Sequence, residues 1–342
     1  MSETSIQDIL PLVQMPSRYL GSETNRVIKP WDKTPLHVAL AFPDLYEIAT
    51  SHFGIQILYG MLNAREDILA ERVFAPAVDM EAQLRKNKLP LCSLESETPL
   101  KNFDILGFSL LYELNYTNMV NMLDLAGIAF FAEQRREKDP FVIGGGPCTC
   151  NPEPIADFFD ALVVGDGEAV ILQMTDAWQA WRRSDSNKRD ALLHRWSQIK
   201  GVYIPSFFDV SIDAGGRQRL MPKKSSHHQV ERAVASDLNA EPLPSTPIIP
   251  FGRPVHDRLR VEIARGCTRG CRFCQAGMIY RPVRERHPEA VLSSVSQLLK
   301  ESGYEDLSLL SLSTGDYSCI APLMKKIMDV GAKNRVAVSL PS

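Results

Sequence analysis

The chain has 342 residues, of which 44% are hydrophobic, and its 38 basic and 41 acidic residues give a net charge of −3. This composition excludes disordered and fibrous classes, and the balanced charge excludes binding to nucleic acid or membranes through an overall electrostatic field. No apolar run approaches the roughly 18 residues of a membrane span, and the opening MSETSIQD lacks the pattern of a signal peptide. We therefore expect a cytoplasmic protein of about two domains.

Short apolar runs alternate with helical patterns over the N-terminal half of the chain. Strands are predicted at residues 37–42, 72–76, 103–109, 141–144 and 161–165, and helices at 51–62, 115–126 and 168–181. Met119, Met122 and Leu123 are expected to face the core. Strands separated by crossover helices predict an α/β fold with a doubly wound parallel sheet.

The middle of the chain has little apolar periodicity. A small hairpin is predicted between residues 208–212 and 219–220, as an appendage to the first domain. The proline-rich stretch from 221 to 254 is interpreted as a semi-rigid linker. His227 and His228 lie in this stretch, and we assign them no ligand role.

A second alternating pattern follows the linker. Strands are predicted at residues 259–264, 307–313 and 336–340, with helices from Pro288 to just before Gly303 and from 322 to 330. This is about two and a half strand–helix units, whereas a complete eight-unit barrel takes about 250 residues. We expect a truncated gene product, or a chain that needs another chain to complete its sheet.

Three of the seven cysteines, Cys267, Cys271 and Cys274, lie on one predicted loop with the spacing C-x3-C-x2-C. A structural zinc site ordinarily takes four ligands in two pairs, and no second pair is nearby. Three thiolates instead suit an iron–sulfur cubane with one iron left open for a substrate or cofactor. Three unligated cysteines are the simpler alternative, but clustered loop thiols are prone to oxidation.

This loop, with Phe273 before the third cysteine and a strand ahead of it, resembles the cluster-binding signature of the radical S-adenosylmethionine (radical SAM) superfamily. The resemblance implies a [4Fe-4S] cluster on the three cysteines and S-adenosylmethionine at the open iron. It also implies reductive cleavage to a 5′-deoxyadenosyl radical, with electrons from an external donor of the flavodoxin or ferredoxin type.

The resemblance also suggests residues that contact S-adenosylmethionine. In the superfamily, a Gly-Gly-Glu segment after the second barrel strand contacts its amino group, and this chain has Ser313-Thr-Gly315-Asp316 there. Gly315 and Asp316 are carried over on that basis, together with Phe273.

Residues 251–291 hold nine arginines against four acids. Some of these arginines are candidates to hold the methionyl carboxylate, a phosphorylated substrate or an RNA backbone. A solvated basic loop that offsets the cluster charge is the simpler interpretation, and nucleic acid is a minority one. The substrate, small molecule or macromolecule, is not readable from the sequence, and no membrane partner is expected.

The first domain resembles the cobalamin-binding domain that precedes many radical SAM barrels. The resemblance implies that Ser109, Gly144, Gly145 and Gly167, at glycine-rich strand ends, line a pocket for the nucleotide tail. The Asp-x-His-x-x-Gly signature that ligates cobalt is missing, and His52 has the wrong spacing. Cobalamin binding and an empty descendant of such a domain both stay open.

Segments along nearly the whole chain, among them Gly165-Asp-Gly-Glu168, resemble a bacterial family of radical SAM proteins with this fused N-terminal domain. Full-length relatives are then expected to continue well past residue 342. Glu47, Tyr112 and Glu113 are candidates to face substrate, although strand-end or cap roles are the simpler interpretation. Cys148 and Cys150 are assigned no redox role.

The sequence thus predicts a cobalamin-binding-like domain at 1–200, a hairpin and linker at 201–255 and the start of a partial (β/α) radical SAM barrel at 256–342. The predicted function is that of a radical SAM enzyme, with methyl transfer competing with methylthio transfer and rearrangement. Methylthio transfer usually needs a second cluster, which the scattered remaining cysteines do not favour. The alternative is a non-catalytic iron–sulfur module or an inactive fragment.

Overall fold

The computed structural model describes residues 4–184, 188–223, 227–241, 243, 246–252 and 254–340. The chain forms two compact units. Unit 1 comprises Met1–Ser22, Val27–Ala49 and Leu62–Val234, and unit 2 comprises Glu23–Arg26, Thr50–Met61 and Ala235–Ser342. Two short N-terminal segments therefore pack with the C-terminal part of the chain.

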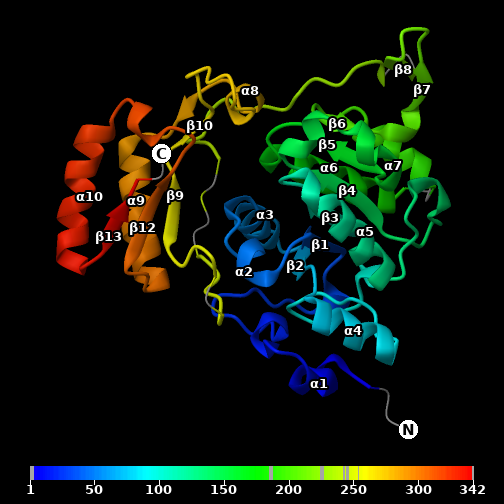
Figure 1. The fold of residues 1–342 in the computed structure, drawn as a ribbon, viewed down its shortest axis with the longest axis horizontal. Helices are drawn as coiled ribbons and strands as arrows, with labels where there is room; N and C mark the ends of the chain where they lie inside the picture. Colours follow the sequence, from blue (N-terminus) through cyan, green and yellow to red (C-terminus); the bar gives the residue numbers. More distant parts are fainter. Residues whose placement is uncertain are drawn as a thin grey trace. The chain divides into compact units, whose positions relative to one another are not determined.

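Unit 1 is built on a six-stranded sheet in the order β2-β1-β3-β4-β5-β6 (Figure 1). The strands are β1 (Leu36–Phe42), β2 (Ile68–Phe74), β3 (Ile105–Ser109), β4 (Phe141–Gly145), β5 (Ala161–Val163) and β6 (Val202–Tyr203). The first five are parallel, and β6 adds an antiparallel edge next to β5. The predicted doubly wound α/β sheet is confirmed, and its order is that of flavodoxin-like folds.

Helices follow the strands of this sheet. They are α1 (Ile6–Ile9), α2 (Tyr46–Ala49), α3 (Phe53–Asn63), α4 (Val78–Asn87), α5 (Tyr116–Leu125), α6 (Glu168–Arg182) and α7 (Arg189–Trp196). Met119, Met122 and Leu123 of α5 are fully buried, as their spacing predicts. Most of α3, up to Met61, belongs to unit 2.

The predicted linker is in part a packed element of unit 1. β7 (Phe208–Ile212) and β8 (Gln218–Pro222) form the predicted hairpin. Beyond it, His227 is buried, and its Nδ1 lies 3.1 Å from the carbonyl oxygen of Ser197. The Ala233 amide donates to the Val164 carbonyl at 2.9 Å. Because of these contacts, residues 227–234 are packed against unit 1 and are not a linker. The sequence does not indicate this packing, since their few apolar and aromatic residues form no periodic pattern.

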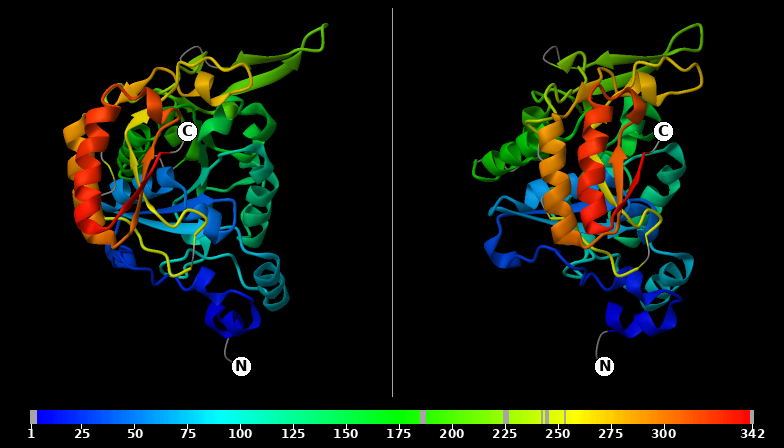
Figure 2. Two further views of the ribbon diagram at one scale, coloured as in Figure 1. Left: turned by 60° about the vertical axis from the view of Figure 1, so that its left-hand side comes forward. Right: turned by 90° about the vertical axis from the view of Figure 1, so that its left-hand side faces the viewer.

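Unit 2 contains a three-stranded parallel sheet in the order β13-β12-β9. Its elements are β9 (Leu259–Glu262), β10 (Ala264–Arg265), α8 (Ala276–Ile279), β11 (Arg284–Glu285), α9 (Pro288–Ser302), β12 (Asp306–Leu310), α10 (Ile320–Asn334) and β13 (Ala337–Ser339). Figure 2 shows α9 and α10 running side by side along the sheet. Their apolar faces cover Val261 and Leu309, which are fully buried.

The ends of α9 match the sequence signals. Pro288 occupies the first turn, where its missing N–H costs no hydrogen bond, and Gly303 caps the C-terminus in a left-handed conformation with φ of 68°. Within the described ranges, no helix is long and apolar enough to cross a membrane.

Candidate functional site

The cysteine loop is closed at its base by a short antiparallel ladder. Ala264 of β10 pairs with Glu285 of β11, and Arg265 pairs with Arg284. Gly266 follows at once with φ of +92°, and a Cβ there would lie 2.5 Å from the carbonyl oxygens of Tyr280 and Pro282. Only glycine fits this position. The sequence thus fixes where the loop leaves and rejoins unit 2.

The three thiols lie on the part of the loop that this ladder holds. Cys267 and Cys274 are half-buried and Cys271 is exposed, and all three are free thiols. The Cys274 amide donates to the Cys271 carbonyl at 3.1 Å, and the Arg269 amide points at the Cys267 sulfur at 3.5 Å. Amide donors to sulfur are a usual feature of cluster-binding cysteines.

The residues present fit an iron–sulfur cluster by their chemistry. Among the described residues, no group of three or more His, Cys, Asp and Glu side chains is already gathered to hold a metal ion. The three thiols are nevertheless accessible, share one short loop and include the amide-bonded Cys267. Phe273 is 92% exposed, so its ring has no packing role within the described part of unit 2.

A buried ion-pair network stabilises the base of the cysteine loop. Glu262, at the end of β9, accepts from Arg265 at 2.8 and 3.0 Å and from Arg286 at 3.4 Å. Arg286 also donates to the carbonyl oxygens of Leu238 and, at 2.9 Å, Glu241. Several of the predicted basic residues are therefore structural, whereas Arg253 of that segment lies outside the described residues.

Asp316, a predicted S-adenosylmethionine contact, forms an ion pair with an arginine of the cysteine loop. It accepts from Arg269 at 2.5 Å and from the Ser313 hydroxyl at 2.7 Å. The Arg269 guanidinium, followed by the Ser313 hydroxyl, lowers the pKa of Asp316 from its ordinary value. Gly315 lies in the same turn, and open space surrounds the position where its Cβ would be. The structure thus joins the turn Thr314–Asp316, which follows β12, to Arg269 between the first two cysteines.

Replacing Asp316 by asparagine is expected to loosen the cysteine loop. The pair is exposed, so its loss should cost at most about 1 kcal/mol and raise amide exchange at residues 269–273 by about five-fold. Hydrogen exchange measured peptide by peptide checks this. The matched control is Asp213→Asn, which breaks the exposed pair with Arg219 in the β7–β8 hairpin and should leave the loop unchanged. Unchanged loop exchange in the Asp316 variant would contradict this role.

The cobalamin-like candidates lie at the carboxyl ends of the unit 1 strands. Ser109 pairs with Gly145, Phe108 pairs with Gly144, and Gly167 precedes α6. A Cβ on Gly144 would lie 2.6 Å from Leu162 and 2.9 Å from Phe159. Core packing alone accounts for that glycine, and a role of these residues in a cofactor pocket stays a prediction.

The loops that follow β1 and β3 are bonded to each other at the point where the strand order reverses. The Tyr112 hydroxyl donates to Asp44, and Asn115 and Asn118 both donate to the Pro43 carbonyl at 3.0 Å. Burial, followed by the contact with Asp44, raises the pKa of Tyr112 to about 12. Tyr112 therefore stays protonated and ties the loops together.

The two glutamates predicted together with Tyr112 to face substrate also have contacts or positions that fit a structural role. Glu47 accepts from Arg18 at 2.8 Å within unit 1. Glu113 opens the short 3-10 turn Glu113–Asn115 that leads into α5. These positions agree with the simpler strand-end and cap interpretation.

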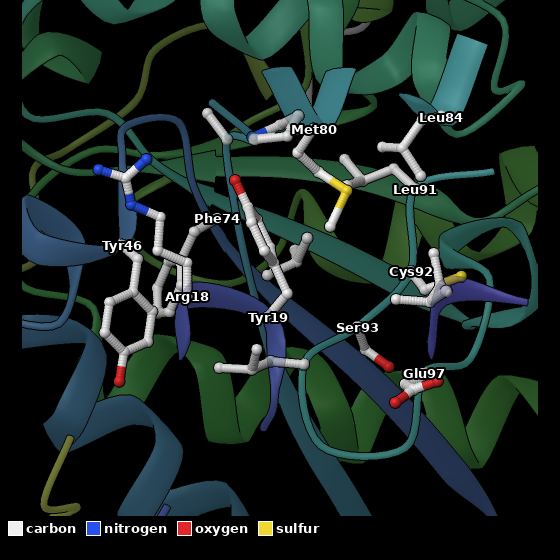
Figure 3. Close-up of a pocket in the computed structure, with 15 residues that line it drawn as sticks. Arg18, Tyr19, Tyr46, Phe74, Met80, Leu84, Leu91, Cys92, Ser93 and Glu97 are labelled. Atoms are coloured by element: carbon white, nitrogen blue, oxygen red, sulfur yellow. The ribbon is translucent and has the colours of Figure 1, made fainter. Parts of the chain in front are cut away.

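A hollow that the sequence does not signal lies beside the end of β2, as Figure 3 shows. It measures about 570 Å³ including space open to solvent, and Tyr19 lies between Phe74 and Met80. The Tyr19 hydroxyl accepts from the Ala77 amide at 3.0 Å. Burial raises the pKa of the Cys92 thiol to about 12, so this cysteine is a poor nucleophile. The aromatic and methionine residues give no periodic signal, because they come from separate segments.

Residues 54–205 match the model of the family described as "Radical SAM proteins, N-terminal". Over this range the chain is similar to the N-terminal region of radical SAM proteins. The resemblance to radical SAM proteins recognised in the sequence is confirmed over this range, which ends before the cysteine loop.

Relatives of known sequence or structure extend this comparison. An uncharacterized protein of Methanocaldococcus jannaschii is 25% identical over 301 residues, which cover 86% of this chain and 53% of that protein. Two structures of the radical S-adenosylmethionine methyltransferase TsrM from Kitasatospora setae match in fold. One, with tryptophan and a SAM analogue bound, has a TM-score of 0.53 at 14% identity and covers 88% of this chain and 54% of its own. The other, with cobalamin and a [4Fe-4S] cluster bound, has a TM-score of 0.54 at 13% identity and covers 89% and 54%.

The matched proteins are longer than this chain. It spans about half the length of the curated relative and of the solved structures that it matches. At these identities the structures share the fold. They confirm the mixed α/β architecture predicted from the sequence.

Proposed function

We propose that this chain binds a [4Fe-4S] cluster through Cys267, Cys271 and Cys274 and serves a radical SAM enzyme, with methyl transfer as its reaction class. The observation that carries the proposal is the position of three free thiols on one loop, pinned by β10 and β11 directly after β9. The family match and the methyltransferase neighbours support the class and the reaction.

When bound, such a cluster would supply the electron that cleaves S-adenosylmethionine to methionine and a 5′-deoxyadenosyl radical. The chain's own residues have supporting tasks. Glu262 holds Arg265 and Arg286, which fixes the base of the loop, and Arg269 joins the loop to Asp316. The Arg269 amide donates to the Cys267 sulfur, which holds that thiol in place on the loop.

The remaining cofactor and partner assignments belong to the same proposal. Cobalamin would bind at the carboxyl edge of the unit 1 sheet, where Ser109 and Gly145 lie next to each other. Because no described residue offers the histidine signature, cobalamin would be held without a histidine ligand from that signature. An external donor of the flavodoxin or ferredoxin type would deliver electrons.

The test is anaerobic reconstitution with iron and sulfide, followed by incubation with S-adenosylmethionine and dithionite. The expected result is a brown protein that releases 5′-deoxyadenosine or S-adenosylhomocysteine. Added hydroxocobalamin, which becomes a methyl acceptor once it is reduced, is expected to favour the second product if methyl transfer is the reaction. A colourless protein contradicts cluster binding.

A non-catalytic cluster module is the second candidate. It is favoured by the described barrel elements, which form a sheet of only three strands. In the same assay, a cluster that forms without cleavage of S-adenosylmethionine would support this candidate and contradict the first.

A further inference from the structure

A second hollow lies within unit 2, at the start of β9 and thus at the opposite end of that strand from the cysteine loop. It measures about 450 Å³ including space open to solvent. Its wall comes from three parts of the chain: Thr50 with the start of α3, residues 247–250 and 254–260, and the end of α9 with Tyr304. These segments are distant in sequence, so the hollow exists only in the folded unit.

Hydrogen bonds hold the wall together. The His256 amide donates to the Ser51 hydroxyl at 3.1 Å. The Ile249 amide donates to the Thr24 carbonyl at 3.1 Å, and Asn25 donates to the Pro247 carbonyl at 2.9 Å. The two N-terminal segments that belong to unit 2 thus brace the residues of this hollow.

The lining is rich in basic groups. Arg258, Arg260 and His256 all line the hollow, and Arg258 donates to the Ser339 hydroxyl at 3.3 Å. Asp257 is a nearby acid and is exposed. Burial, followed by the charge of Asp257, raises the pKa of Tyr304. The positive charge of two guanidinium groups is therefore only partly balanced.

The surroundings of Arg260 indicate that this hollow binds an anion. Arg260 is largely buried, and across the described ranges its guanidinium has neither a hydrogen-bond acceptor nor a carboxylate partner. Burial is the main reason that the pKa of Arg260 falls to about 10, and the positive charge of Arg258 acts in the same direction. A buried charge without a partner is costly, so such an arginine ordinarily has a counter-ion.

We propose that this hollow binds a phosphate group, held by Arg260 and Arg258. Two guanidinium groups match a dianion, and arginine presents paired N–H donors to phosphate oxygens. Thr50, Gln56 and Tyr304 line the same space and add polar groups for the remaining oxygens. The site is separate from the cysteine loop, and the proposal does not rest on the proposed function.

His52 lies beside this site without titrating near neutral pH. It is half-buried, its Nδ1 accepts from the Ile55 amide at 3.2 Å, and desolvation, followed by the charge of Arg260, lowers its pKa to about 4. The neutral ring therefore caps the start of α3, and the positive charge available to an anion comes from the arginines.

The test titrates the full chain with inorganic phosphate at constant ionic strength, followed by calorimetry and thermal denaturation. Phosphate is expected to raise the Tm of the wild-type chain, since it binds the folded state. Arg260→Gln should weaken binding at least ten-fold and Arg260→Lys by less. Arg195→Gln, which removes an exposed arginine of unit 1, is the matched control and should bind as the wild type does.

A second variant separates ligand binding from a structural role. Without phosphate, Arg260→Met is expected to have a higher Tm than the wild type, because it removes a buried charge that lacks a partner. A lower Tm for Arg260→Met would show that the arginine stabilises the fold and would overturn the proposal. Equal phosphate affinities for Arg260→Gln and Arg195→Gln, or no binding by the wild type, would also overturn it.

Two further ligands test whether the site prefers phosphate to a carboxylate, and a phosphate ester to the free ion. Acetate at the same concentration is expected to bind at least ten-fold more weakly, and equal binding would overturn the assignment to phosphate. A nucleoside monophosphate that competes with inorganic phosphate supports the site in either case. If it binds more tightly, the site takes a phosphate ester, and if more weakly, the free ion.

Discussion

Replacing Cys271 by alanine is expected to reduce iron after anaerobic reconstitution from about four atoms per chain to a small residual amount. The reason is that the loop supplies three thiols and no fourth: Gly266 and the β10–β11 ladder fix its ends, and Cys267 and Cys274 cannot hold a cubane as two ligands. Cleavage of S-adenosylmethionine is expected to fall to background with it. Iron and sulfide analysis with the visible absorption spectrum provides the measurement.

Cys150→Ala is the matched control for this experiment. Cys150 is also an exposed free thiol, but it lies in unit 1 at the end of a short 3-10 turn. Iron content is expected to stay at the wild-type value in this variant. If Cys271→Ala retains as much iron as Cys150→Ala, the loop thiols are not the ligands and the proposed function fails.

The cysteine loop was predictable because its signal is local. The spacing of three thiols, the preceding strand and the glycine at 266 all lie within a few residues of one another. The contact of Arg269 with Asp316 was not predictable, since 47 residues separate the two. The likeness to a Gly-Gly-Glu segment suggests a cofactor contact for Asp316, which stays a prediction, and it gives no sign of the ion pair with the loop.

Charged core residues explain the main error in strand placement. The second strand is predicted at 72–76 but runs from Ile68 to Phe74, and every residue in it is buried. Glu71 and Arg72 break the apolar pattern in the sequence. In the fold they are paired with Ser96 and Glu95, more than 20 residues away, so burial costs little.

Among the helices that were not predicted, α4 and α7 were missed for a related reason. α4 is mostly polar, and only Met80 and Leu84 of it are buried, which is too few for a periodic signal. α7 is short and holds its place partly through Arg189, a buried arginine. The inclusion of Glu23–Arg26 and Thr50–Met61 in unit 2 is a matter of tertiary packing and has no local signature.

Replacing Asp160 by alanine is expected to destabilise unit 1 by about 3–5 kcal/mol. Asp160 precedes β5 and accepts from Arg135 at 2.9 Å and Arg189 at 2.7 Å, and all three side chains are at most 9% exposed. It also accepts from the Val142 amide of β4 at 2.8 Å. Without this carboxylate, two buried guanidinium groups lose their counter-ion, and their remaining bonds go only to neutral carbonyls such as those of Phe130 and Asp139.

Urea denaturation followed by tryptophan fluorescence measures this effect in unit 1 alone, because all four tryptophans of the chain lie in its segments. The matched control is Asp124→Ala, which breaks an ion pair with Arg85 whose two side chains are each 46% exposed. Solvent screens that pair, so a loss of at most about 1 kcal/mol is expected. Equal losses in the two variants would show that the network around Asp160 stabilises the sheet no more than a surface contact does. A large difference would show that the buried carboxylate holds α7 and the segment before β4 against the sheet whose carboxyl edge carries the predicted cofactor residues.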